Sequence, residues 1–370
     1  MSIPMEETKK LGFGLMRLPH KGVLIDIEQT KQMVDLFMGA GFTYFDTAFV
    51  YPGSEEAIRK ALVERYNRED YTLATKLYAP LALTEKMAKK EFDTSLERTN
   101  AGYFDYYLLH SLMANNYQKY ERFHLWDFTR EQKEKGLIKH IGFSFHDGPK
   151  LLDEILTKHP EVEFVQLQIN YADWENPFVT SRANYEVARM HGKMVTIMEP
   201  VKGGRLAKPI DKVNQLFQEY APDASAASWA IRFAASLDGI LTVLSGMSNV
   251  EQMENNLSYM TDFKPLNQEE QAIIQEAQTL LGSLATIPCT SCHYCTKGCP
   301  RQIAIPEIFA AMNIRLANGQ KQEAKEEYQK VVSSGHCASD CIDCHQCEEA
   351  CPQHIEITKH LKECQEAFEN

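Results

Sequence analysis

The C-terminal part of the chain contains two runs of four cysteines with the same spacing. The runs are Cys289-x2-Cys292-x2-Cys295-x3-Cys299-Pro300 and Cys341-x2-Cys344-x2-Cys347-x3-Cys351-Pro352. Thiolates are soft ligands, and three of them two residues apart can wrap a tight loop around an iron–sulfur cubane. The following proline stops the chain as it leaves the loop. We therefore predict that these eight cysteines hold two [4Fe–4S] clusters.

Zinc is the alternative metal, but zinc sites favour two CxxC pairs that close one tetrahedron. The runs resemble those of bacterial ferredoxins, in which the fourth cysteine of each run binds the other cluster. The resemblance implies two ligand sets, which are Cys289, Cys292, Cys295 and Cys351 in one and Cys341, Cys344, Cys347 and Cys299 in the other. Cys337 and Cys364 match no position of the pattern, and we predict that they are spare thiols.

In the first two thirds of the chain, six polar residues each lie at the end of an apolar run. The group consists of Asp46, Lys76, His110, Ser144, Asn170 and Glu199. The apolar runs cover residues 11–18, 42–47, 71–76, 105–110, 138–144, 164–170, 194–199 and 239–245, and amphipathic helical patterns separate them. Strands that alternate with helices indicate a parallel sheet covered by helices. Eight such units predict a (β/α)8 TIM barrel, and a doubly wound sheet is the alternative. In a barrel the strand ends form one rim, so the six polar residues would lie close together there.

The distribution of cysteine predicts where the barrel ends. All ten cysteines lie from Cys289 onward. We therefore expect a boundary between Leu281 and Pro288, with the barrel over residues 1–284 and the cluster domain over residues 285–370. The insert between the two cysteine runs is helical in pattern over residues 305–334. It resembles the small α-helical ferredoxin-like domain that is fused to larger oxidoreductases.

The barrel sequence resembles the aldo/keto reductase family over about residues 8–260. The resemblance rests on YFDTAFVYPGSEE, LATKLY and YLLHSL, together with LGFGLMRLP and IGFSFH. It implies a catalytic tetrad of Asp46, Tyr51, Lys76 and His110. A tyrosine has an unperturbed pKa of about 10, and a neighbouring ammonium favours the phenolate. Tyr51 is then the general acid tuned by Lys76, Asp46 holds Lys76 by a charge-assisted hydrogen bond, and His110 polarises the carbonyl.

The resemblance also implies an extended NAD(P)(H) site without a Rossmann fingerprint, and GxGxxG is indeed absent. Ser144 and Gln166 would bind the nicotinamide carboxamide, and the loop 200–206, with Gly203 and Gly204, would approach the pyrophosphate. The segment 245–256, with Gly246, Gln252 and Asn256, would hold the adenosine phosphate end.

Three positions depart from the family pattern. Met198 stands where many relatives stack a tyrosine on the nicotinamide. Gly246 and Gln252 replace the Lys and Arg of NADPH-specific members, which removes the charge that binds a 2′-phosphate. Arg205 is an alternative cation. The cofactor therefore remains open between NADH, NADPH and a flavin.

These features predict a redox enzyme that acts on a small-molecule carbonyl, alcohol or related organic substrate. Hydride transfer moves two electrons and each cluster carries one, so a flavin or an external electron-transfer protein would mediate between them. The alternative is an NAD(P)H-dependent carbonyl reductase whose clusters are structural or redox-sensing. A third hypothesis, a non-enzymatic regulatory or electron-carrier subunit, is disfavoured by the complete tetrad. Trp174 and Phe178, in the loop 170–178, are candidate walls of the substrate pocket.

The net charge of −12 argues against a nucleic-acid partner, which needs a cationic surface. It equally disfavours docking on anionic lipid, and no apolar run is long enough to span a bilayer. The N-terminal sequence lacks the apolar region of a signal peptide. We therefore expect a cytoplasmic protein, in which reduced thiols can serve as metal ligands.

Overall fold

The computed structural model describes residues 4–284, 286–333 and 335–369. The chain forms two compact units. The first contains the residues up to Pro200 together with Ala227–Asn267, and the second contains Val201–Ala226 and the residues from Gln268 onward. The domain boundary at residues 284 and 285 stays a prediction.

The first unit is built on a closed parallel barrel of eight strands, which confirms the predicted fold class. The strands are β1 (Leu11–Gly14), β4 (Tyr44–Asp46), β5 (Thr72–Leu77), β6 (Phe104–Leu112), β7 (Ile138–Phe145), β8 (Phe164–Gln168), β9 (Met194–Met198) and β10 (Ile240–Ser245). Each strand pairs with its neighbours in chain order, and β10 pairs with β1 to close the barrel. Most strand residues are buried, as expected for a parallel sheet with helices outside it.

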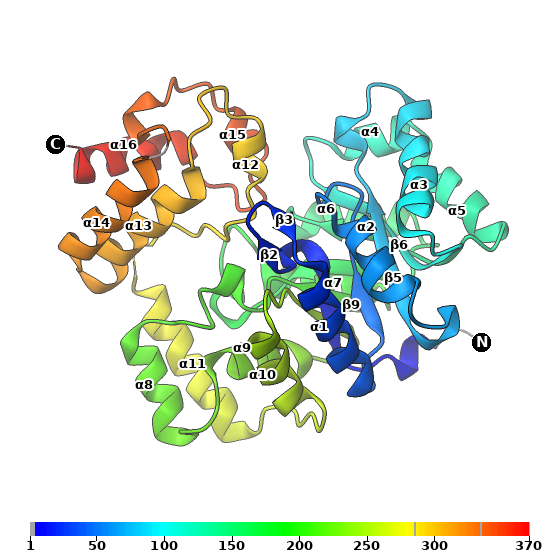
Figure 1. The fold of residues 1–370 in the computed structure, drawn as a ribbon, viewed down its shortest axis with the longest axis horizontal. Coiled ribbons are helices and arrows are strands. Elements are labelled where there is room, and N and C mark those ends of the chain that lie inside the picture. The colour runs from blue at the N-terminus through cyan, green and yellow to red at the C-terminus, as the bar shows by residue number, and fades with distance from the viewer. Residues whose placement is uncertain (1–3, 285, 334, 370) are drawn as a thin grey trace. The chain divides into compact units, whose positions relative to one another are not determined.

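Helices connect the strands and lie around the barrel (Figure 1). They are α1 (Ile27–Gly39), α2 (Ser54–Ile58), α3 (Glu85–Thr99), α4 (Tyr117–Arg122), α5 (Leu125–Glu134), α6 (Pro149–Lys158), α7 (Ser181–Met190), α9 (Ala226–Ala235) and α10 (Val250–Met260). Polar caps determine where several of them begin. Asp26 accepts a hydrogen bond from the Gln29 amide at 3.1 Å at the start of α1, and Asn249 accepts one from the Gln252 amide at 2.8 Å at the start of α10.

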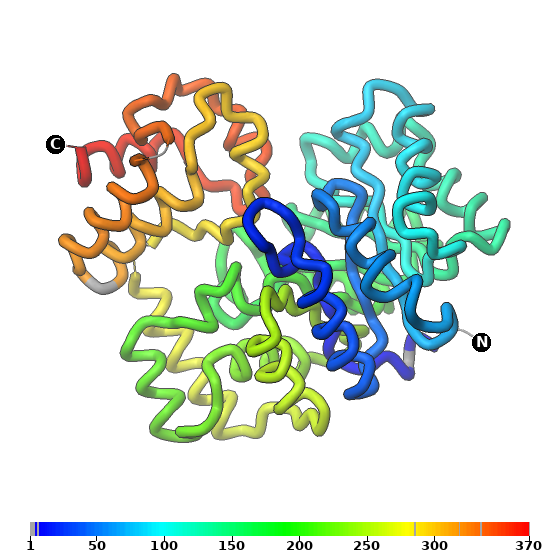
Figure 2. The backbone as a smooth tube through the Cα atoms, viewed as in Figure 1, coloured from blue at the N-terminus to red at the C-terminus, as the bar shows by residue number. Residues whose placement is uncertain are grey.

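Two local features were not predicted from the sequence. The pattern of residues 117–136 resembles one helix, but His124 has φ +49° and separates α4 from α5. A short hairpin, β2 (His20–Lys21) with β3 (Leu24–Ile25), follows β1 and forms the dark-blue loop of the trace in Figure 2. Gly22 has φ +66° in its turn, which glycine adopts without the penalty of a side chain.

The second unit is helical. Its helices are α8 (Asp211–Tyr220), α11 (Gln268–Gly282), α12 (Tyr294–Lys297), α13 (Ile305–Asn318), α14 (Lys321–Val332), α15 (Gln346–Glu349) and α16 (Ile357–Phe368). Helix α13 packs against α14 and α16, as Figure 1 shows. The core between them is apolar and includes Ile308, Phe309 and Leu361, and the Tyr328 and Phe368 rings stack at 4.7 Å.

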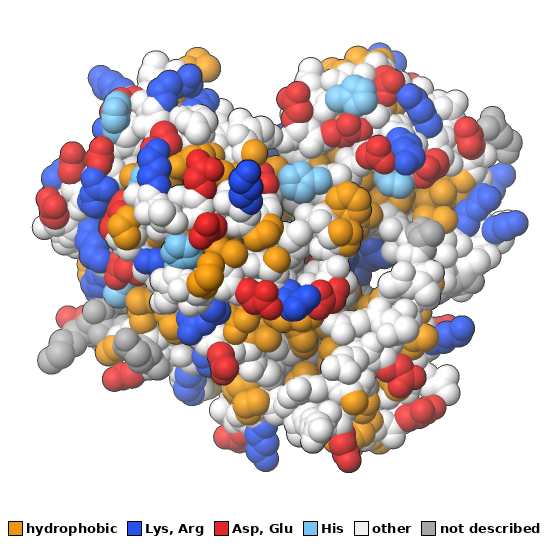
Figure 3. Space-filling model, turned by 180° about the vertical axis from the view of Figure 1, so that it is seen from behind, with side chains coloured by type: hydrophobic (Ala, Val, Ile, Leu, Met, Phe, Trp, Pro, Cys, Tyr) orange, Lys and Arg blue, Asp and Glu red, His pale blue; other side chains and the backbone are white. Residues whose placement is uncertain are grey.

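The surface carries charges of both signs. Lys and Arg side chains are interspersed with Asp and Glu over the face drawn in Figure 3. Within the described residues, no helix combines the length and the apolar character that a membrane span requires.

Candidate active site and cluster sites

A buried ion pair joins two neighbouring barrel strands. Lys76, near the end of β5, and Asp46, the last residue of β4, are 0% and 3% exposed. The Lys76 ammonium donates hydrogen bonds to Asp46 Oδ1 at 2.5 Å and to the Thr47 carbonyl oxygen at 2.7 Å. Burial lowers the pKa of Lys76 and raises the pKa of Asp46, and each partner's charge opposes the other's shift. The charged form of each group is therefore stabilised by the charge of its partner.

Tyr51 and His110 lie beside this pair. Tyr51 follows β4 in the loop before α2, and Lys76 Nζ lies 5.2 Å from the centroid of its ring. His110, from β6, meets the Tyr51 ring edge-on, with 5.7 Å between the centroids and 84° between the planes. The structure thus brings together the four residues of the predicted tetrad.

A buried carboxyl group holds the loop that carries Tyr51. Glu55 is 1% exposed, and it accepts hydrogen bonds from Thr75 Oγ1 at 2.8 Å and from Arg98 at 3.3 Å. Arg98 also donates to the carbonyl oxygen of Phe49 at 3.1 Å. Helix α3 is therefore tied to both sides of Tyr51. The sequence placed Glu55 in an amphipathic helix and contained no signal for this role.

His110 is supported by residues that the sequence did not single out. Its ring contacts the Tyr78 ring edge-on at 5.5 Å, and Tyr120 donates its hydroxyl hydrogen to the His110 carbonyl oxygen. The Tyr78 amide donates to Glu91 Oε2 at 2.8 Å. Burial raises the pKa of Glu91 to about 7. The Glu91 carboxyl group, which titrates near neutral pH, therefore holds the backbone of Tyr78, and the Tyr78 ring contacts His110.

The residues predicted to bind the nicotinamide lie on consecutive strands. Ser144 on β7 is in register with Gln166 on β8. Gln166 Nε2 lies 3.6 Å from the sulfur of Met198 on β9, and Ser144 Oγ accepts a hydrogen bond from the Ser111 amide at 2.7 Å. Gln166 Oε1 is buried and has no hydrogen-bond partner among the described residues. Because a buried acceptor without a donor is costly, this oxygen suits the NH2 group of a carboxamide.

The residues predicted for the adenosine end lie at and after the end of β10. An added Cβ at Gly246 would lie 3.3 Å from Cδ of Arg17, so a cation from another segment is next to this position. Gln252 accepts a hydrogen bond from the Ser248 amide at 2.8 Å. Asn256 donates to the Gln252 carbonyl oxygen at 2.7 Å within α10. These roles in binding a nucleotide stay predictions.

Gly203 and Gly204 belong to the second unit, and both have positive φ, +64° and +96°.

The two predicted walls of the substrate pocket, Trp174 and Phe178, differ in exposure and contacts. Phe178 is 70% exposed, whereas the Trp174 ring contacts Tyr185 at 5.8 Å and Phe233 at 5.6 Å.

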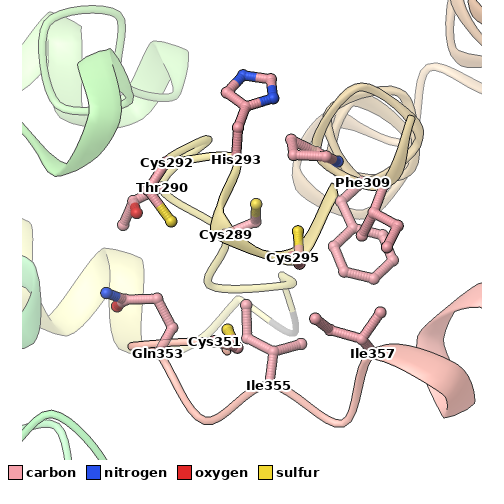
Figure 4. Close-up of a pocket in the computed structure, with 12 residues that line it drawn as sticks. Cys289, Thr290, Cys292, His293, Cys295, Phe309, Cys351, Gln353, Ile355 and Ile357 are labelled. Atoms are coloured by element: carbon pink, nitrogen blue, oxygen red, sulfur yellow. The ribbon is translucent and has the colours of Figure 1, made fainter. Parts of the chain in front are cut away.

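The cysteines line two cavities, each of about 310 Å³ including open solvent space. Cys289, Cys292, Cys295 and Cys351 line the first (Figure 4), and Cys299, Cys341, Cys344 and Cys347 line the second. These are the two sets that the sequence predicts, three cysteines from one run and one from the other. In Figure 4 the ring of His293 points away from the sulfur atoms, so the predicted ligands of the first cavity are its thiols.

Each cavity fits a group with four soft ligand sites. Burial raises the pKa of Cys289 and of Cys351, and Arg205 is among the groups that oppose the shift at Cys289. Thiols of this kind are deprotonated when a metal binds them. Among the described residues no three Cys, His, Asp or Glu side chains are arranged to hold a metal ion, so the assignment rests on the cysteine spacing and the shared cavities.

The other two cysteines lie outside both cavities. Cys364, on α16, is buried in the helical core. Cys337 is half-buried, and its amide donates to Asp340 Oδ2 at 2.8 Å.

Comparison with known proteins identifies both parts of the chain. The model of the aldo/keto reductase family matches residues 10–279, and the model of a 4Fe-4S dicluster domain matches residues 288–356. The chain therefore belongs to the aldo/keto reductase family and carries a 4Fe-4S dicluster domain. The resemblance predicted from the sequence is confirmed, and so is the assignment to the oxidoreductases.

Curated relatives match part of the barrel. Aldo-keto reductase family 1 member C21 of Rattus norvegicus is 29% identical over 168 residues, which are 40% of this chain and 51% of the relative. Methylglyoxal reductase DkgA of Escherichia coli O157:H7 is 29% identical over 149 residues, which are 39% of this chain and 49% of the relative. The chain thus spans about half the length of the curated relatives it matches.

Solved structures match the barrel fold. The aldo-keto reductase AKR11C1 from Bacillus halodurans has a TM-score of 0.57 and 23% identity, covering 72% of this chain and 91% of that chain. An aldo-keto reductase from Klebsiella pneumoniae in complex with NADPH has a TM-score of 0.60 and 19% identity, covering 73% and 91%. At these identities the likeness shows the fold alone.

Glu91 generates a prediction about pH. Its folded-state pKa, about 7, exceeds the ordinary value of 4.5, so its contribution to stability is complete below pH 4.5 and is lost as the pH rises through 7. Glu91→Gln mimics the neutral form. Its free energy of unfolding should match that of the wild type at pH 4 and exceed it by up to about 3 kcal/mol at pH 8.

Urea unfolding followed by tryptophan fluorescence measures this difference, because all three tryptophans lie in the first unit. Glu97→Gln, at an exposed position of the same helix, is the control and should show no pH-dependent difference. A constant difference for Glu91→Gln at every pH would contradict the prediction.

The cysteine sets generate a prediction about iron. In anaerobically purified protein, Cys351→Ser should lower the iron content from about eight to about four atoms per chain, because it removes one ligand of one cubane. Cys337→Ser, which changes a thiol outside both cavities, should keep about eight. Equal iron loss in the two variants would show that the cavities do not define the ligand sets.

Proposed function

We propose that the protein is an NAD(P)(H)-dependent oxidoreductase of small carbonyl compounds and alcohols, or related organic substrates, coupled to electron transfer through two [4Fe–4S] clusters. The observation that carries this proposal is the arrangement of Tyr51 and His110 around the buried Lys76–Asp46 pair. Thiol ligands require a reducing compartment, so we place this activity in the cytoplasm.

The proposed catalytic residues divide the work at the carbonyl oxygen. Tyr51 donates its phenolic proton to the oxygen that gains charge when the carbonyl is reduced. The Lys76 ammonium, 5.2 Å from the ring, stabilises the phenolate that remains. Asp46 holds Lys76 in place through the 2.5 Å hydrogen bond. His110, next to Tyr51, orients and polarises the carbonyl group.

The nicotinamide supplies the hydride when it is bound. Ser144 and the unpaired oxygen of Gln166 suit its carboxamide, and Met198 would contact the ring. The Klebsiella relative was solved with NADPH, which supports a phosphorylated cofactor, although Gly246 and Gln252 carry no charge that would select it. A flavin remains the alternative.

The clusters supply one-electron steps when they are present. Cys344 is exposed, and the neighbouring Ile342 is 57% exposed. The second cysteine set is therefore accessible to an external one-electron carrier protein, which we propose as the partner.

A structural role for the clusters is the second candidate, and one observation favours it. Cys295, Cys347 and Cys351 belong to the apolar core of the second unit. Removing the clusters would leave voids in that core, so the helical domain would lose stability while the barrel stayed folded.

Tyr51→Phe tests the catalytic assignment. With methylglyoxal, named in the Escherichia coli relative, or a panel of simple aldehydes and NADPH, kcat/KM should fall by about 10²- to 10⁴-fold because the proton donor is lost. Tyr66→Phe is the matched control, since the Tyr66 hydroxyl donates to Asp35 on the surface. Full activity of Tyr51→Phe would refute the role of Tyr51 as general acid.

Anaerobic absorbance spectroscopy tests the coupling. NADPH added to the holoenzyme should bleach the visible absorbance of the clusters if electrons pass between nicotinamide and iron. Bleaching by dithionite alone would favour the structural role. A bound flavin would appear in the same spectra and would identify the mediator.

A further inference from the structure

The segment 201–206 follows β9 and belongs to the unit that contains the cysteine runs. Its backbone packs directly on the first cysteine loop, because a Cβ at Gly203 would clash with the carbonyl group of the buried Thr290. Gly203 also has φ +64°. Only glycine satisfies both conditions without strain.

Arg205 strengthens the same contact. Its guanidinium donates from Nη1 to the carbonyl oxygen of Ile287 at 2.7 Å. Ile287 is 1% exposed, and both its amide and its carbonyl are hydrogen-bonded to the Asn313 side chain, at 2.8 and 2.9 Å. A positive charge is therefore fixed on a rigid backbone two residues before Cys289, in a half-buried position.

We propose that Arg205 raises the reduction potential of the cluster held by Cys289, Cys292, Cys295 and Cys351. Reduction adds one negative charge to a cluster that four thiolates already surround. A fixed cation stabilises the reduced state more than the oxidised state, and partial burial strengthens the effect. This inference rests on the cluster assignment made under the proposed function.

The second cavity provides a comparison within the same unit. Its lining includes Arg301, but Arg301 is ion-paired with Asp340 at 3.7 Å. A neighbouring carboxylate offsets much of the field of a cation. Glu307 adds a negative charge near Cys289 in the same way, so the effect of Arg205 is measured by its removal and not by comparing the two clusters.

The sequence left Arg205 as an alternative cation for a nucleotide phosphate. The bond to Ile287 instead holds the guanidinium against the cysteine loop. The two roles predict different losses, since one changes the affinity for NADPH and the other changes a reduction potential.

An anaerobic redox titration of the full chain, followed by electron paramagnetic resonance, tests the inference. Cys299→Ser, which removes a ligand of the second set, identifies the signal of the first cluster. Arg205→Gln should shift the ratio of oxidised to reduced first cluster about tenfold at a given potential, which is a fall of about 59 mV for one electron. The second cluster should not change.

Two further variants separate charge from folding. Lys208→Gln removes the same charge from an exposed position three residues away and should leave both potentials unchanged. Arg205→Lys keeps the charge and should retain a potential near that of the wild type. If Arg205→Gln loses iron, the test depends on Arg205→Lys. A first-cluster potential in Arg205→Lys equal to that of the wild type supports the role of the charge, and a tenfold shift in that variant overturns it.

The inference fails if Arg205→Gln retains about eight iron atoms and neither potential moves, or if both clusters or the Lys208 variant shift equally. It also fails if the only change is weaker NADPH binding. Absence of iron from the wild-type protein would instead refute the cluster assignment itself.

Discussion

The buried Lys76–Asp46 pair is the constraint on which the barrel site depends. Both charges are withdrawn from water, and the cost of this burial is offset only while the two groups remain within hydrogen-bond distance. Their strands, β4 and β5, are adjacent and in register, so the barrel itself holds the pair together. Tyr51 and His110 then take their positions around a charge that cannot move without a large energetic cost.

The support around this pair extends outward through polar contacts of α2 and α3. Glu55 and Arg98 hold the loop that carries Tyr51, and Glu91 holds the backbone of Tyr78. Burial raises the pKa of both carboxyl groups. These two helices outside the barrel thus position two of the four proposed catalytic residues, although none of their own side chains belongs to the tetrad.

The helical unit faces a different physical problem. Its cysteine loops are irregular, and several of the thiols fill positions in the apolar core. Iron–sulfur clusters in these cavities would therefore complete the core. The segment 201–206 contributes to the first loop although it lies far from the cysteines in the sequence. A contact across 82 residues, from Arg205 to Ile287, makes the environment of one cluster unlike that of the other.

The sequence by itself determined the eight strands and the family, and it supplied the residues proposed for both sites. These features depend on local patterns: apolar strands alternating with amphipathic helices, cysteines two and three residues apart, and motifs that follow individual strands. The tertiary structure alone decided the break at His124, the burial of Glu55 and Glu91, and the attachment of Arg205 to the first cysteine loop. Each of these depends on backbone conformation or on partners distant in sequence, which no local spacing encodes. A glutamate on an amphipathic helix and an arginine in a glycine-rich loop look like surface residues until the packed chain surrounds them.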